Sequence, residues 1–143
     1  MNITIRSATI ADLAVIYHFM CELKEKQLDF NRFKECLDIN LQRQDAYHLV
    51  AEAEGKVVGF LSCYGQIVLH HCGMEYEIQE MYVDAEYRGK KIGQTLLQAI
   101  EERIGEYKSL KVCSNVRRKE AHRFYTSHDI EQTGYRFIKL GDA

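Results

Sequence analysis

The fold is decided by one stretch of sequence, EMYVDAEYRGKKIG, which covers residues 80–93. Residues 75–83 have the composition of a β-strand, and from residue 92 onward apolar side chains recur at helical spacing. The first N–H groups of a helix have no partner within it, and the helix dipole is positive at that end. A phosphate group placed there accepts several backbone hydrogen bonds. The loop between the strand and the helix is therefore predicted to bind an anion.

The composition of this loop strengthens the prediction. Gly89 allows the backbone to approach a ligand closely, and Arg88, Lys90 and Lys91 add positive charge. The spacing matches neither a P-loop nor the dinucleotide fingerprint G-x-G-x-x-G, which disfavours both of those ligand classes. A basic turn without a ligand is the plain alternative. If the loop holds an anion, the contacts come from Arg88, Gly89, Lys90, Lys91, Ile92 and Gly93.

The elements around this junction predict one mixed α/β domain over residues 1–143. Meandering strands followed by strand–helix units favour a mixed sheet with helices on both faces. The expected strands are 3–5, 47–53, 57–69, 75–83, 110–113 and a hairpin-like end at 135–140. The expected helices begin after Thr9, cover 29–44, begin at Gly89 and cover 117–127.

Composition and charge exclude several classes of protein. The net charge of −2 provides no general attraction to nucleic acid or to an anionic membrane. No apolar run approaches the roughly 20 residues of a membrane-spanning helix, and the first residues lack the layout of a signal peptide. The five cysteines include no C-x-x-C pair, which favours free thiols over disulfides or structural zinc. We expect a cytoplasmic protein with no nucleic-acid or membrane partner.

The junction also resembles a known family. Residues 87–93, after Met81-Tyr82-Val83, resemble the signature of the Gcn5-related N-acetyltransferase (GNAT) superfamily. That signature is Arg or Gln, two residues, Gly, one residue, then Gly or Ala. Arg88 and Gly93 keep the pattern, whereas Lys91 stands where the first Gly is expected. The resemblance implies a splayed mixed sheet of about six or seven strands with about four helices. It also implies direct acetyl transfer from acetyl-CoA to a primary amine in a ternary complex.

The same resemblance implies roles for further residues. The backbone of residues 81–83 would hydrogen-bond the pantetheine amides of the coenzyme. Residues 115–125 resemble the late helix of the superfamily, so Asn115 and the helix face near Ala121 would line the pantetheine arm. Tyr125 would then be the general acid, since a phenol with a pKa near 10 can protonate a departing thiolate. Ordinary packing of Tyr125 is the alternative.

An attacking ammonium group must also lose a proton to a base. Glu77 and Glu80 lie on the strand before the loop, and strict alternation places them on opposite faces. Met81 and Val83 have the character of core residues beneath the following helix, which favours Glu80 as the carboxylate that faces the substrate. Glu77 is the second candidate, and a solvated strand carboxylate is an equal alternative for both.

Several local runs resemble one subfamily, the aminoalkylphosphonate N-acetyltransferases. The runs are CELK at 21–24, YHL at 47–49, LHH at 69–71, EIQE at 77–80 and AHRFY at 121–125. This resemblance implies a small-molecule amine acceptor that carries a phosphonate. It also allows for a divalent metal ion that helps to hold this acceptor. Family likeness also implies a homodimer. The residues assign no metal ligands, because His70 and Cys72 share one face of the expected strand and His71 points to the other.

Other functions stay open at this point. A non-catalytic CoA-binding regulatory module would share the loop and leave Tyr125 and Glu80 incidental. An acetyltransferase for a polyamine, an aminoglycoside or an amino acid fits the same motifs. The net charge disfavours a DNA-binding regulator, and Cys113 as an acyl carrier lacks a Cys-His-carboxylate pattern.

Overall fold

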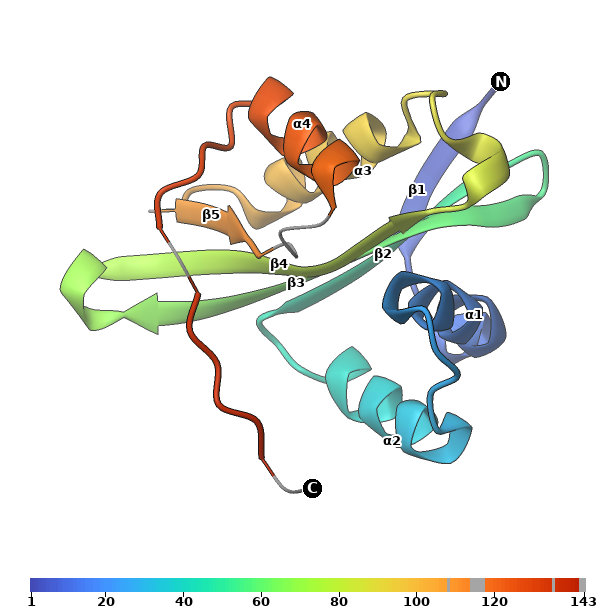
Figure 1. Cartoon of the computed structure of the whole chain (residues 1–143), viewed down its shortest axis with the longest axis horizontal. Coiled ribbons are helices and arrows are strands. Elements are labelled where there is room, and N and C mark those ends of the chain that lie inside the picture. The colour runs from blue at the N-terminus through green and yellow to red at the C-terminus, as the bar shows by residue number, and fades with distance from the viewer. Residues whose placement is uncertain (108, 114–117, 135, 142–143) are drawn as a thin grey trace.

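The computed structural model describes residues 1–107, 109–113, 118–134 and 136–141. Over these residues it contains five strands and four α-helices (Figure 1). The strands are β1 (Ile3–Ser7), β2 (Ala46–Ala53), β3 (Lys56–Val68), β4 (Gly73–Val83) and β5 (Ser109–Val112). The helices are α1 (Leu13–Lys24), α2 (Phe30–Leu41), α3 (Ile92–Ile104) and α4 (Lys119–Ser127).

The strands form one mixed sheet with helices on both faces, as the sequence predicts. The strand order is β1-β2-β3-β4-β5, with antiparallel pairing up to β4 and parallel pairing between β4 and β5. Helices α3 and α4 lie on one face, and α1 and α2 lie on the other (Figure 1). None of the helices in the described part of the chain is both long and apolar enough to cross a membrane.

Each face of the sheet has its own apolar core. On the α3 face, Ile92, Leu96 and Ile100 repeat at four-residue spacing and are 0–1% exposed. On the α1 face, Ile16 and Phe19 are 1% exposed in the second cluster. Burying one such side chain stabilises the fold by about 1.5–3 kcal/mol. The two cores therefore hold the sheet rigidly between its helices.

Strand β4 contains a bulge that changes which residues share a face. Ser62 pairs with Glu80 and Cys63 pairs with Ile78, so Gln79 has no partner across the β3–β4 ladder. A single extra residue shifts the alternation of a strand by one. Glu77 consequently lies on the same face as Glu80. The expectation of opposite faces is wrong for this reason.

In the described part of the chain, the β4–β5 ladder is short and covers only part of β4. Pairing with β5 ends at Ile78 and Val112, whereas β4 continues to Val83. The edge of residues 79–83 that faces away from β3 has no ladder partner among the described residues. This arrangement of the described strands agrees with the splayed sheet that the family resemblance implies. An extended ligand could add to the edge there by backbone hydrogen bonds.

The expected sixth or seventh strand is absent from the described residues. Residues 136–140 form no strand, and Tyr135 lies outside the described residues. Phe137 is 92% exposed and Leu140 is 81% exposed. The alternation of this segment is typical of a strand, but a strand also needs a neighbour to complete its backbone hydrogen bonds. No described strand pairs with it.

Candidate functional site

The loop before α3 has the backbone geometry of an anion site. Gly89 has φ of 78°, and Lys91, which precedes the first helical residue, has φ of 67° and ψ of 18°. The side chain of the cap residue Lys91 forms no hydrogen bond to the α3 N-terminus, so the first N–H groups of the helix lack this cap and can bind a ligand. Gly adopts positive φ without steric cost, which explains why a Gly is expected at position 91. Lys91 takes the same conformation and adds a cation.

The basic side chains of the loop lie against aromatic rings. Arg88 donates from Nε to the Val83 carbonyl at 3.0 Å, and its guanidinium lies 5.2 Å from the centre of the Tyr82 ring. The Lys90 ammonium lies 5.1 Å from the centre of the Tyr87 ring. These contacts concentrate positive charge beside the exposed start of α3. The residues present therefore fit a pyrophosphate group.

The Lys91→Gly substitution separates the effect of the left-handed backbone at this position from the effect of the lysine charge. Glycine relieves the left-handed conformation, so we expect the free energy of unfolding to stay the same or rise by up to about 1 kcal/mol. Loss of the cation should raise the KM for acetyl-CoA a few-fold. Thermal unfolding and steady-state kinetics measure the two effects. Lys90→Gly is the matched control, because it removes a loop charge without relieving positive φ. An unchanged KM would show that the Lys91 charge does not contact the coenzyme.

Helix α4 packs on the first turn of α3. A Cβ built on Gly93 would lie 3.3 Å from the Phe124 ring, so the small residue permits this close approach. The neighbouring Tyr125 is 8% exposed. Burial raises the pKa of Tyr125, although the charge of Arg118 acts in the opposite direction. Tyr125 therefore keeps its proton at neutral pH. Ala121 lies on the same helix, and Asn115 lies outside the described residues.

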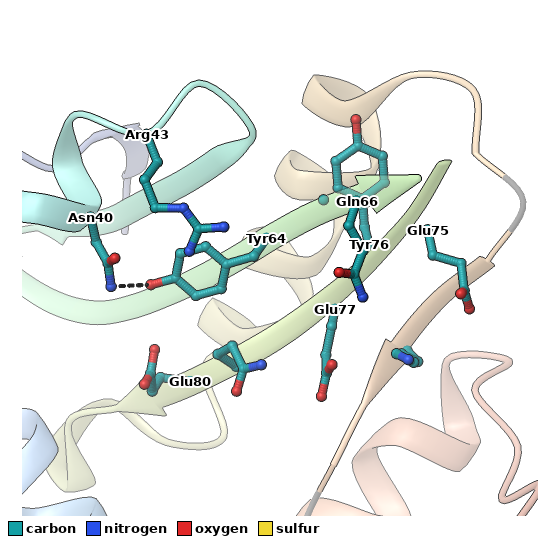
Figure 2. A pocket seen from close by; sticks show the side chains of 11 residues that line it. Asn40, Arg43, Tyr64, Gln66, Glu75, Tyr76, Glu77 and Glu80 are labelled. Atoms are coloured by element: carbon teal, nitrogen blue, oxygen red, sulfur yellow. Dashed lines mark hydrogen bonds between the residues drawn. The ribbon is translucent and has the colours of Figure 1, made fainter. Parts of the chain in front are cut away.

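A polar pocket of about 390 Å³, which we call the β4 pocket, lies beside the bulge (Figure 2). It is built from the end of α2 and the segment after it, from β3 and β4, and from β5. Its lining contains cations and carboxylates as well as neutral polar groups. The lining residues are Asn40, Arg43, Tyr64, Gly65, Gln66, Glu75, Tyr76, Glu77, Gln79, Glu80 and Lys111.

The β4 wall of this pocket carries the carboxylates. The Ser62 hydroxyl donates a hydrogen bond to Glu80 and also accepts one from the Glu80 backbone N–H at 3.0 Å. The Cys113 thiol donates to Glu77 Oε2 at 3.4 Å. Desolvation and this hydrogen bond raise the pKa of Cys113, which keeps it a thiol at neutral pH. Glu77 and Glu80 thus face one space with fixed orientations.

The opposite wall comes from residues that the sequence reasoning did not select. Tyr64 lies at its centre, and its hydroxyl accepts a hydrogen bond from Asn40 Nδ2 at 3.0 Å. His48 Nε2 lies 3.0 Å from the same oxygen. Burial, followed by the charge of Glu80, raises the pKa of Tyr64 to about 12. The polar residues Ser62, Tyr64 and Gln66 alternate along β3, and this pattern could have indicated the wall.

A second pocket, the α1 pocket, of about 580 Å³ lies next to the loop that precedes α3. It contains two of the residues that the sequence selects, Tyr82 and Arg88. Cys21 and Glu22, near the end of α1, form part of its far side. The complete lining is Cys21, Glu22, Glu25, Lys26, Gln27, Tyr82, Ala85 and Arg88.

The structure brings only some of the selected residues together. Glu77 and Glu80 share the β4 pocket, whereas Tyr125 lines neither pocket. Met81 and Val83 pack against the α3 core, as expected. Their backbone still lies on the open part of β4.

The histidines at the β3–β4 connection lie outside the strands, whereas the sequence predicts that they lie on a strand. His70 and His71 belong to a 3-10 turn instead of a strand, and their ring centres lie 4.2 Å apart. His71 Nδ1 lies 3.2 Å from Glu75 Oε1. Across the described part of the chain, no three His, Cys, Asp or Glu side chains are grouped closely enough to hold a metal ion.

Comparisons with known proteins agree with this fold. A family model described as "Acetyltransferase (GNAT) domain" matches residues 44–129. An aminoalkylphosphonate N-acetyltransferase from Salmonella typhimurium strain LT2 is 36% identical over 137 residues, which cover 94% of this chain and 89% of the relative. The structure of aminoglycoside N-acetyltransferase AAC(6')-Iy in complex with CoA superposes with a TM-score of 0.85 at 12% identity, covering 99% of this chain and 96% of that one. Glucosamine-6-phosphate N-acetyltransferase from Arabidopsis thaliana has a TM-score of 0.80 at 20% identity, with 99% and 100% covered. These two structures show the shared fold.

Proposed function

The chain belongs to the GNAT acetyltransferase family and uses acetyl-CoA to acetylate an amine, and from this premise we propose that its acceptor is a small aminoalkylphosphonate bound in the β4 pocket. The observation that carries the proposal is the position of Glu77 and Glu80, which face one pocket where the β4–β5 ladder ends. Two carboxylates at such a place attract an ammonium group and can accept its proton. The name of the Salmonella relative supports the acceptor class.

The coenzyme would occupy the opening next to this pocket. Its pyrophosphate would lie at the uncapped start of α3, within the loop 88–93. Its pantetheine arm would follow the open edge of residues 81–83, with Ala121 and Asn115 as proposed neighbours. Acetyl-CoA supplies a thioester whose acetyl group is transferred to the amine. The loop, the strand edge and the pocket would hold both reactants in one place.

Two side chains of this protein would move the protons. Glu80, oriented by Ser62, would take a proton from the acceptor nitrogen, with Glu77 as the second candidate. Tyr125, which burial keeps protonated, would donate a proton to the coenzyme sulfur. Three further statements stay predictions from the sequence: the chain is a single domain, it forms a homodimer, and it acts in the cytoplasm.

A panel of amines tests the acceptor class. Release of free coenzyme A thiol should be fastest with aminoalkylphosphonates and slower with polyamines, aminoglycosides and amino acids. Each amine is measured with and without a divalent metal ion, because the family resemblance leaves room for one. Faster turnover of an aminoglycoside or a polyamine would replace the proposed acceptor. Tight coenzyme binding without thiol release for any amine would instead favour a non-catalytic module.

A further inference from the structure

The β4 pocket has charges of both signs on different walls. Glu77 and Glu80 lie on β4, whereas Arg43 lies after the end of α2 (Figure 2). Lys111 on β5 is the other cation of the lining; it lies opposite Glu77 in the β4–β5 register, and after the Ser109 hydrogen bond its charge also lowers the pKa of Glu75. Among the described residues neither cation forms an ion pair with a carboxylate, but only Arg43 stacks a cation–π contact onto a ring of the same lining, that of Tyr64. Arg43 therefore offers a ligand a cation that comes from a different element than the β4 carboxylates.

Arg43 is also held in place before any ligand arrives. Its guanidinium carbon lies 4.8 Å from the centre of the Tyr64 ring, which is a cation–π contact. The ring is fixed in turn, because its hydroxyl contacts Asn40 Nδ2 and His48 Nε2, each at 3.0 Å. The Arg43 backbone N–H donates to the Asn40 carbonyl at 3.2 Å, which ties the segment to α2. Among the described residues the guanidinium makes this ring contact and no ion pair, so its N–H groups can donate hydrogen bonds to a ligand.

The surroundings of Arg43 keep its charge available. Burial lowers the pKa of His48, and the charge of Arg43 lowers it further, so His48 is neutral at neutral pH. Tyr64 is protonated there as well, because its pKa is about 12. Neither neighbour competes for the guanidinium as an anion. A planar guanidinium with free N–H groups matches two oxygens of an oxyanion.

We propose that Arg43 selects the acceptor by binding an oxyanion at the end of the substrate opposite its amine, while Glu80 faces the amine. This inference rests on the proposed function, since it assumes that the β4 pocket holds the acceptor. The chemistry shared by the ligands is an oxyanion on a short aminoalkyl chain. A tetrahedral phosphonate and a planar carboxylate are both of this class, and the test includes one of each.

The test compares three amines of matched length: 2-aminoethylphosphonate, β-alanine and propylamine. The protein variants are Arg43→Gln, Arg43→Lys and, as a matched control on α2, the exposed Arg32→Gln, which lines neither pocket. Arg43→Gln should lower kcat/KM for the phosphonate by about 10²-fold and leave that for propylamine nearly unchanged. Arg43→Lys should recover part of the loss, and Arg32→Gln should match the unmodified protein. The β-alanine arm shows whether the site prefers a tetrahedral oxyanion.

Equal losses for all three amines, or no loss with Arg43→Gln, would overturn the role of Arg43. Calorimetric titration with methylphosphonate measures oxyanion binding without acetyl transfer. It therefore tests the role of Arg43 separately from the proposed acetylation of a phosphonate amine. Binding should weaken about tenfold or more in Arg43→Gln. If the unmodified protein binds methylphosphonate through Arg43 but acetylates no phosphonate amine, only the proposed function fails. Absent or equal binding in the two proteins would contradict the role of Arg43.

Discussion

Replacing Tyr125 with phenylalanine should lower kcat by about 10²–10⁴-fold and leave the Kd for coenzyme A unchanged. The substitution removes the hydroxyl and keeps the ring, so the packing of α4 on α3 is preserved. Tyr125 is buried and its pKa is raised, so the hydroxyl is a proton donor throughout the neutral range. Without this hydroxyl, the coenzyme sulfur would have to leave as a thiolate or take its proton from water. Initial rates of thiol release and calorimetric titration with coenzyme A measure the two quantities.

A second tyrosine provides the control for this experiment. Tyr107 is 41% exposed and lines neither pocket, so Tyr107→Phe should leave kcat unchanged. Full activity of Tyr125→Phe would remove Tyr125 as the acid. A weakened Kd for coenzyme A with normal kcat would assign its hydroxyl to coenzyme binding instead.

Replacing Glu80 with glutamine should lower kcat by about 10²-fold or more at neutral pH. Glutamine keeps the shape of the side chain but cannot accept the proton of the acceptor ammonium. The rise of kcat with pH that depends on the ionised base should therefore flatten. The full pH profile of kcat, measured with a saturating amine, records both effects.

Glu77→Gln is the matched comparison for this profile. Both carboxylates line the β4 pocket, but the Glu80 carboxylate accepts a hydrogen bond from the Ser62 hydroxyl, whereas Glu77 accepts a weaker one, at 3.4 Å, from the Cys113 thiol. We expect a smaller loss of kcat from Glu77→Gln and a pH profile of normal shape. If Glu77→Gln flattens the profile and Glu80→Gln does not, the roles of the two residues are exchanged.

The parts of the site that local chemistry determines could be predicted from the sequence. The junction from β4 to α3 has its own signals, because cations and glycines precede a regular apolar spacing. The position of the loop between β4 and α3 and the core positions of Met81 and Val83 follow from them, whereas anion binding by the loop stays a prediction. Lys91 has a positive φ, the conformation that favours the Gly expected at this position.

Features that depend on distant partners could not be predicted in this way. The bulge at Gln79 is a property of the pairing between β3 and β4, and no residue type at this position indicates it. It moved Glu77 onto the face of Glu80. Arg43 and Tyr64 are 21 positions apart in the chain and meet only because α2 ends beside β3. Residues 136–140 alternate like a strand but lack a neighbour among the described strands.

The most direct test of the account is a crystal structure with coenzyme A and 2-aminoethylphosphonate bound together. The account predicts the amine nitrogen within about 3 Å of the Glu80 carboxylate and the phosphonate on the Arg43 guanidinium. The pyrophosphate should lie on the loop 88–93 at the start of α3. An acceptor bound in the α1 pocket, beside Tyr82 and Arg88, would contradict the assignment of the β4 pocket as the place of acetyl transfer.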